Sequence, residues 1–156
     1  NQTNIKSIYA IGDVTDRINL TPVAIAEGHA FSDREFGNKN RFISYDNVPS
    51  AVFSQPPVSV VGLTLEDAKT LNIKAKEFMS EFNPLKNTLT GKQEKTLMKL
   101  VVDENDKVLG AHMLGDYSPE IIQGIAVSIK AGAKKSDFDA TIGIHPTAAE
   151  EFVTMK

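Results

Sequence analysis

The alternation of apolar and polar residues is clearest just beyond the middle of the chain. Residues 96–103 (TLMKLVVD) and 108–114 (VLGAHML) are strand-length, largely apolar segments on either side of the polar turn 104–107. Two such segments joined by a short polar turn are typical of an antiparallel hairpin. We therefore expect these two segments to pair as neighbouring strands.

Other segments around this hairpin show strand-like and helical patterns. Extended structure is expected over 51–53, 58–61 and 73–82, and a polar loop over 83–95. Helices are expected from Thr64 to about Asn72, from 118 to about 131, and for one turn over 136–139. Strands interspersed with helices in this order predict an α+β domain over 46–156, with a mostly antiparallel sheet flanked by helices.

The N-terminal part of the chain reads as a separate strand and helix. Residues 5–11 (IKSIYAI) predict a buried strand that ends at Gly12-Asp13. Thr21 is a suitable N-cap and Pro22 a suitable first residue for a helix to about Gly37. Its apolar positions are Val23, Ile25, Ala26, Ala30 and Phe31. We assign 1–37 to this strand and helix, 38–45 to a linker and 46–156 to the second domain.

Composition narrows the class of protein. A chain of 156 residues with 41% hydrophobic and 24% charged residues is ordinary for one globular domain, or one domain plus part of another. The net charge of −3 and the lack of a long apolar run give no reason to expect nucleic acid or membrane as a partner. There is no cysteine, so this chain has no thiol nucleophile. Because it begins at Asn1, we expect a piece of a longer protein.

The most informative stretch for chemistry is residues 145–151 (HPTAAEE). One interpretation is a capped terminal helix, in which Thr147 and Glu150 form a capping box. The other is an acid/base pair, in which Glu150 orients and charges the imidazole of His145. Spacing alone favours the capped helix. A metal site formed by His145, Glu150 and Glu151 fits no standard ligand spacing, and we expect none.

Three further candidates are weaker. Asp13, just past a predicted strand, could accept hydrogen bonds from sugar hydroxyls, although a turn aspartate is the ordinary interpretation. The helix start at Thr21 would offer backbone N–H groups to an anionic or electron-accepting ligand, although most helix starts bind nothing. His112 lies within a predicted strand, where we expect a structural histidine.

Three stretches together resemble the flavin disulfide reductases. YAIGDV (9–14) and LTPVA (20–24) resemble the second FAD-binding motif, and VFSQPP (52–57) with VGLT (61–64) resembles the start of the dimerisation domain. HPT (145–147) with EEFVTM (150–155) resembles the C-terminal catalytic motif, in the form found in glutathione reductases rather than lipoamide dehydrogenases. The three stretches occur in the family's order and cover nearly the whole chain.

The resemblance implies the C-terminal part of a homodimeric, NADPH- and FAD-dependent reductase of glutathione disulfide. Asp13 would bind the ribityl–pyrophosphate region of FAD, and the helix start at Thr21 would face the pyrimidine end of the flavin. His145 would be the acid/base for the glutathione thiol in the partner subunit's site, and Glu150 would hold its tautomer. The resemblance also implies a cis peptide bond before Pro146.

Two departures qualify this expectation. His29 stands where the family has a substrate-binding arginine, and an imidazole lacks the guanidinium's bidentate fork; Phe53 is a further position implied to bind substrate. The chain also has no Gly-x-Gly-x-x-Gly motif and no redox cysteine pair, so we expect it to be inactive alone. A reductase of another disulfide and a non-catalytic dimerisation module stay open. We expect a cytoplasmic location, with an organellar one left open.

Overall fold

The predicted hairpin forms the centre of the second half of the chain. In the computed structural model, which describes residues 1–156, β4 (Thr96–Asp103) pairs antiparallel with β5 (Val108–Leu114). The Asp103 carboxylate accepts the backbone N–H groups of Asn105 and Lys107 at 2.9 and 2.8 Å. The acidic turn is therefore explained by its own hydrogen bonds, and the predicted hairpin is confirmed.

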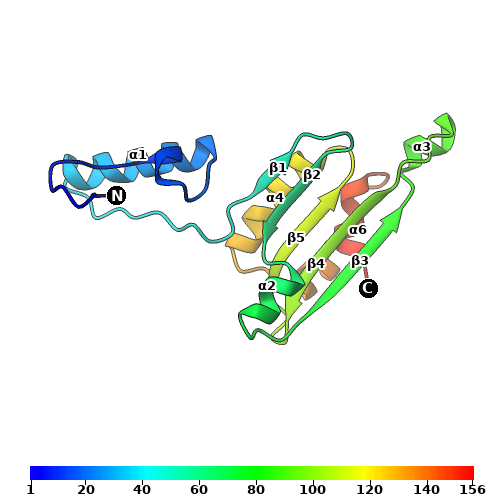
Figure 1. Ribbon diagram of the computed structural model, residues 1–156. Helices are drawn as coiled ribbons and strands as arrows, with labels where there is room; N and C mark the ends of the chain where they lie inside the picture. Colours follow the sequence, from blue (N-terminus) through cyan, green and yellow to red (C-terminus); the bar gives the residue numbers. More distant parts are fainter. The chain divides into compact units, whose positions relative to one another are not determined.

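Three further strands complete one antiparallel sheet. They are β1 (Ser50–Val52), β2 (Val58–Gly62) and β3 (Ala75–Phe82). The strand order is β1-β2-β5-β4-β3, and every neighbouring pair is antiparallel (Figure 1). The predicted α+β class with a mostly antiparallel sheet is confirmed.

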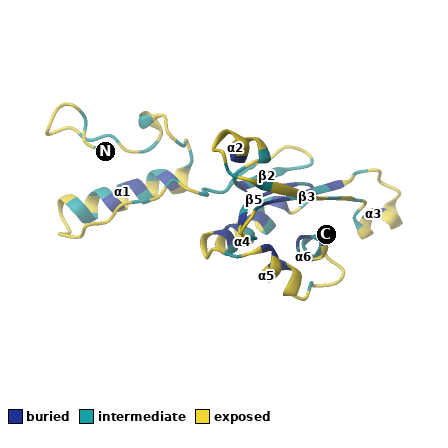
Figure 2. Cartoon of the chain, turned by 90° about the horizontal axis from the view of Figure 1, so that it is seen from below, coloured by how far each residue is buried: buried dark blue, intermediate teal, exposed yellow.

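Helices cover one face of this sheet. The helical segments of this part are α2 (Leu65–Thr70), α3 (Leu85–Thr90), α4 (Ser118–Lys130), α5 (Lys135–Ala140), η2 (Ala148–Glu150) and α6 (Glu151–Thr154). Figures 1 and 2 show α4, α5 and α6 on one side of the sheet and α2 on the other. Between the sheet and α4–α6 lies an apolar core whose members include Met98, Leu100, Met113, Ile122 and Phe152, each at most 1% exposed.

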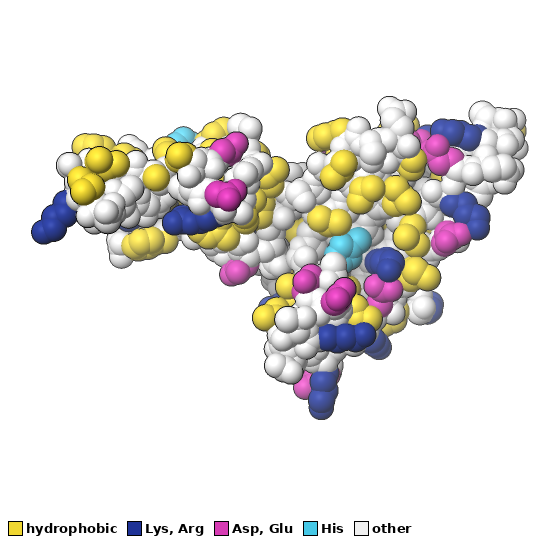
Figure 3. Space-filling view, viewed as in Figure 1, with side chains coloured by type: hydrophobic (Ala, Val, Ile, Leu, Met, Phe, Trp, Pro, Cys, Tyr) yellow, Lys and Arg dark blue, Asp and Glu magenta, His cyan; other side chains and the backbone are white.

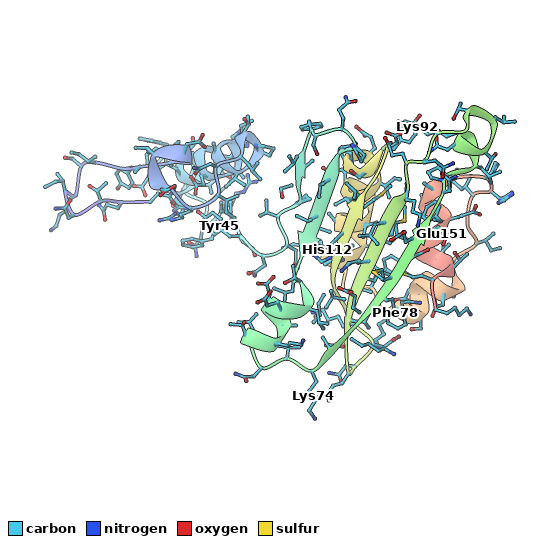
Figure 4. The ribbon with its side chains drawn as sticks, turned by 45° about the vertical axis from the view of Figure 1, so that its right-hand side comes forward. Tyr45, Lys74, Phe78, Lys92, His112 and Glu151 are labelled. Atoms are coloured by element: carbon cyan, nitrogen blue, oxygen red, sulfur yellow. The ribbon has the colours of Figure 1, made fainter.

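The opposite face of the sheet, here called the open face, is largely uncovered. The register places Val60, His112 and Lys99 side by side across β2, β5 and β4. Figure 3 shows apolar side chains gathered around a histidine on this face, and Figure 4 labels it as His112. Its Nε2 atom is buried without a hydrogen-bond partner. Burial, reinforced by the charge of Lys99, lowers the pKa of His112, so the neutral imidazole is favoured.

Residues 1–45 form a compact unit of their own, distinct from residues 46–156. This unit contains the short 3₁₀-helix η1 (Gly12–Thr15) and the helix α1 (Thr21–Glu35). The buried strand predicted over 5–11 is wrong: only one isolated bridge, Gln2 to Tyr9, forms there. Ile5 and Ile8 are 51% and 52% exposed. An apolar run becomes a buried strand only where other strands pair with it, and residues 1–45 contain no such sheet.

Several smaller predictions differ from the structure. The stretch 83–95, expected to be a loop, contains α3, which ends at Gly91 in the left-handed conformation (φ 71°). Thr21 is the first residue of α1 rather than its N-cap, which is Leu20, and Ile25 is 54% exposed rather than buried. No helix of the chain combines the length and the apolarity that a membrane crossing requires.

The start of α2 offers a simple test of local stability. Thr64 Oγ1 accepts the backbone N–H of Asp67 at 3.1 Å, and the Asp67 carboxylate accepts the backbone N–H of Thr64 at 2.9 Å. Thr64→Ala removes one half of this capping box, and we expect the free energy of unfolding to fall by about 1 kcal/mol. Urea titration followed by circular dichroism measures it. Thr70→Ala, at the end of the same helix, is the matched control; an equal loss there would contradict the capping role.

Candidate catalytic site and flavin-binding turn

His145 and Glu150 form a hydrogen-bonded pair beside the C-terminal helix. The Nδ1 atom of His145 lies 3.0 Å from Oε1 and 3.2 Å from Oε2 of Glu150. The imidazole is 73% exposed, whereas the Glu150 side chain is 20% exposed. The peptide bond between His145 and Pro146 is cis. The structure thus presents an accessible imidazole held by a mostly covered carboxylate.

The local chain conformation explains why the predicted capping box does not form. Thr147 makes no side-chain cap; its hydroxyl instead donates to the carbonyl of Ile144 at 2.7 Å. Gly143 lies so close to Glu150 that an added Cβ would come within 2.8 Å of the Glu150 Cβ atom. The absence of a side chain at Gly143 leaves room for Glu150, and the Glu150 carboxylate contacts His145. The capped-helix interpretation of Thr147 and Glu150 is wrong.

The pairing has a defined chemical consequence. A carboxylate only accepts hydrogen bonds, so the neutral imidazole must carry its proton on Nδ1 and donate it to Glu150. That tautomer leaves a free lone pair on the exposed Nε2 atom. An incoming acid can be deprotonated at Nε2, and the resulting imidazolium can return the proton while Glu150 stabilises its charge.

An apolar groove of about 600 Å³ lies beside this pair. Its lining includes Phe82, Tyr117, Ile144, Pro146 and Glu150. The groove therefore connects the covered carboxylate to an apolar surface large enough for a small molecule.

A charged pair stands in the lining of the groove. The Lys86 ammonium donates a hydrogen bond to Asp116 and lies 5.1 Å from the centre of the Tyr117 ring. The hydrogen bond from Lys86 lowers the pKa of Asp116, and the same bond raises the pKa of Lys86. Both groups are therefore ionised around neutral pH, and the groove presents both signs of charge.

Glu151 does not join His145. Its carboxylate accepts a hydrogen bond from Ser80 on β3 at 3.0 Å, and the residue is labelled on α6 in Figure 4. No group of three or more His, Asp or Glu side chains in the chain is placed to hold a metal ion.

The candidate flavin-binding residues lie on adjacent elements of the first unit. Asp13 is exposed in η1, and Thr21 is exposed at the start of α1. Gly12 adopts a positive φ of 69°, and a Cβ added there would lie 3.1 Å from the Cβ of Ala24. This close approach packs the turn onto the first residues of α1. An exposed carboxylate beside an exposed helix start fits a ligand with both hydroxyl and electron-accepting groups.

The two remaining candidates, His29 and Phe53, are both exposed, and neither forms a site by itself. His29 lies on α1 with its side chain exposed, two turns beyond Thr21. Phe53 follows β1 and is 82% exposed, and it is not among the residues that line the groove beside His145.

The sequence prediction missed a buried carboxylate in the first unit. Glu27 on α1 is 2% exposed and binds the Gly12 backbone and the Tyr45 hydroxyl. The signal was available in the sequence, because Glu27 has helical spacing from the buried residues Val23 and Ala30. A carboxylate in the middle of a buried helical stripe requires partners.

The structure thus places an exposed carboxylate beside a helix start in the first unit, and a hydrogen-bonded histidine–carboxylate pair beside an antiparallel sheet in the second. Residues 48–156 match the family model described as pyridine nucleotide-disulphide oxidoreductase, dimerisation domain. The chain belongs to this family.

Similar proteins agree with that assignment. The chain is 56% identical to a glutathione reductase of Nostoc sp. (strain PCC 7120) and 54% identical to one of Burkholderia cepacia, over 99% of its length in both cases. It is 49% identical to a trypanothione reductase of Trypanosoma congolense, again over 99% of its length. These alignments cover 34%, 35% and 32% of the relatives, so the chain spans about a third of their length.

A solved structure supports the fold assignment. The HOCl-induced flavoprotein disulfide reductase RclA from Escherichia coli superposes with a TM-score of 0.83 at 26% sequence identity. The superposition covers 97% of this chain and 35% of that one.

Proposed function

We propose that this chain is the C-terminal part of a homodimeric flavoprotein that reduces glutathione disulfide with NADPH. The overall reaction converts glutathione disulfide, NADPH and one proton into two glutathione thiols and NADP⁺. High identity to two glutathione reductases over nearly the whole chain supports this substrate. The 49% identity to a trypanothione reductase makes another glutathione-derived disulfide the nearest alternative.

One observation carries the catalytic part of the proposal. The 3.0 Å contact between His145 Nδ1 and Glu150 Oε1 leaves Nε2 exposed and able to exchange a proton. In the proposed reaction His145 protonates the departing glutathione thiolate. Glu150 stabilises the imidazolium before that transfer and keeps the neutral tautomer after it, as the acid does in a catalytic triad. By the family resemblance, His145 acts in the partner subunit's site.

FAD is the cofactor that the first unit would help to hold. When bound, it passes electrons from NADPH to the disulfide. Asp13 would accept hydrogen bonds from the ribityl–pyrophosphate region, and the start of α1 at Thr21 would stabilise negative charge at the pyrimidine end. The exposed position of both groups on packed neighbouring elements supports these roles.

The groove beside His145 is the proposed surface for part of the substrate. Glutathione carries ammonium and carboxylate groups at neutral pH, and the paired Lys86 and Asp116 offer both complementary charges. His29 and Phe53 are assigned as further substrate contacts on the family resemblance. At His29 an imidazole would give one hydrogen bond where an arginine would give two.

The substrate is tested on the full-length protein. Oxidation of NADPH is followed by the loss of its near-ultraviolet absorbance, with glutathione disulfide, trypanothione disulfide or lipoamide as acceptor. We expect the highest kcat/KM with glutathione disulfide. A preference for trypanothione disulfide or lipoamide would identify that disulfide as the substrate, within the same family. The absence of turnover with all three would favour a non-catalytic dimerisation module.

The purified 156-residue chain should be inactive in the same assay. It contains no cysteine, so it has no thiol to exchange with a disulfide. We expect it to sediment as a dimer and to bind FAD weakly or not at all. NADPH-dependent thiol release by this chain, or a tightly bound yellow flavin, would contradict this prediction.

A further inference from the structure

The most deeply buried acid in the first unit holds three other segments together. Glu27 is 2% exposed on the inner face of α1. One carboxylate oxygen, Oε2, accepts the backbone N–H of Gly12 at 2.5 Å, and the other, Oε1, accepts the hydroxyl of Tyr45. Arg17 lies 3.7 Å from Oε1 and also donates to the Tyr45 hydroxyl at 3.0 Å. Figure 4 labels Tyr45, the last residue of this unit.

An ionised carboxylate at this position is costly unless its partners are all present. Burial alone raises the pKa of Glu27, but the hydrogen bonds from Tyr45 and Gly12 and the charge of Arg17 outweigh it and leave the pKa below its ordinary value. A buried charged group contributes little net stability compared with an apolar residue of similar volume. Val23 and Ala30 on the same helix face show that apolar residues pack here. A role beyond packing therefore explains the acid better.

The partner at Gly12 indicates what that role is. The Gly12 N–H precedes Asp13 by one residue, and the positive φ of Gly12 redirects the chain at this point. Glu27 fixes this N–H, and the turn packs against Ala24 of α1. Together these contacts set the orientation of Asp13 relative to α1.

We propose that Glu27 is a positioning residue for the flavin: its carboxylate anchors the Gly12–Asp13 turn to α1 and Tyr45, so that Asp13 is held in the orientation that binds FAD. This inference rests on the proposed flavin-binding role of Asp13. Glu27 itself does not contact the cofactor. Loss of its carboxylate leaves the partly buried Gly12 N–H and the Tyr45 hydroxyl without this acceptor, and the turn then reorients to satisfy them.

The same helix offers a matched control. Glu35, near the end of α1, also accepts a hydrogen bond from a tyrosine hydroxyl, that of Tyr9 at 3.0 Å, but this pair is exposed. Glu35→Ala thus removes the same residue type and the same kind of contact from the same helix without disturbing the Gly12–Asp13 turn. Exposed contacts of this kind contribute little because water replaces them.

The test measures FAD affinity of the full-length flavoprotein by titrating its apoprotein with FAD and following flavin fluorescence and the visible spectrum. We expect Glu27→Ala to weaken FAD binding about tenfold or more, because the Gly12 N–H loses its acceptor and the turn that carries Asp13 is no longer fixed. Glu27→Gln should recover most of the affinity, because the amide oxygen still accepts from Gly12 and the amide N–H₂ can donate to Tyr45. Glu35→Ala should bind FAD as the wild type does.

Tyr45→Phe provides a second variant that keeps the Gly12 contact, and a decrease in affinity smaller than that of Glu27→Ala is expected. Wild-type FAD affinity and spectrum in Glu27→Ala would overturn the inference, as would an equal loss in Glu35→Ala or a loss in Glu27→Gln as large as in Glu27→Ala. If the wild-type apoprotein itself bound no FAD, the proposed function would fail first. The two failures are thus distinguishable.

Discussion

Replacement of His145 by alanine in the full-length enzyme is expected to lower turnover of glutathione disulfide about 10²–10⁴-fold, the range typical of a lost general acid/base. Reduction of the flavin by NADPH should keep its wild-type rate, because that half-reaction does not need the thiol's proton. Rapid-mixing absorbance separates the two half-reactions. A full-length variant with unchanged turnover would show that the exposed Nε2 atom transfers no proton in the reaction.

Glu150→Gln tests the contribution of the carboxylate charge in the same assay. The amide keeps the size of the side chain and can still accept from Nδ1, but it carries no charge to stabilise the imidazolium. We expect turnover between those of the wild type and His145→Ala. Glu120→Gln, an exposed acid at the start of α4, is the control and should have wild-type turnover. Equal effects of the two glutamine variants would contradict the assigned pairing.

The second large effect is expected at Phe152, which anchors the segment that carries the acid/base pair. Phe152 is 1% exposed, belongs to the core between the sheet and its helices, and follows Glu150 by two residues. Phe152→Ala leaves a cavity and should lower the free energy of unfolding by about 3–5 kcal/mol. Urea unfolding of this 156-residue chain, monitored by far-ultraviolet circular dichroism, measures the loss.

Leu89→Ala is the control for that experiment. Leu89 lies on α3 and is 94% exposed, so its truncation should change the free energy of unfolding by less than about 0.5 kcal/mol. A cost at Phe152 no larger than at Leu89 would mean that α6 is not held by the core. In the full-length enzyme the Phe152 variant should also lose disulfide turnover, because Glu150 then has no fixed backbone.

The sheet was largely predictable, because its strands are coded by local patterns. Residues 96–114 contain the strands, the turn and the polar residues that satisfy it, so the hairpin needs no distant information. Helix α4, which covers the sheet, likewise follows from apolar spacing, and it ends within one residue of the prediction. Patterns of this kind report which side of an element is buried.

The failures have a common physical cause. Whether residues 5–11 form a strand depends on sheet partners, and an apolar run does not reveal whether those partners exist in the same chain. The role of Glu150 depended on whether its carboxylate would meet the Thr147 backbone or the His145 ring, two choices compatible with the same spacing. Only the three-dimensional path of residues 143–150 separates them.

Some of the site residues could likewise be predicted from the sequence, and others could not. His145 and Glu150 were found because they occur within one short motif, and the structure brings them into contact. The burial of Glu27 could have been inferred from its helical spacing, but its partners Arg17 and Tyr45 could not, because the cluster joins positions up to 28 residues apart. Contacts at that separation are visible only once α1 and the chain after it are folded together.

The strand order also sets the sequence of events by which this sheet can assemble. β3, β4 and β5 follow one another both along the chain and across the sheet, so each can pair with the strand before it, through residues 83–95 for β4 and through the turn 104–107 for β5. β2 must instead pair with β5, with Val58 opposite Leu114, although α2, β3 and β4 all lie between these two strands in the chain. Closing so long a loop is entropically slower than forming a hairpin. The β3–β4–β5 meander should therefore gain hydrogen-exchange protection first during refolding, and β1–β2 should add to it last.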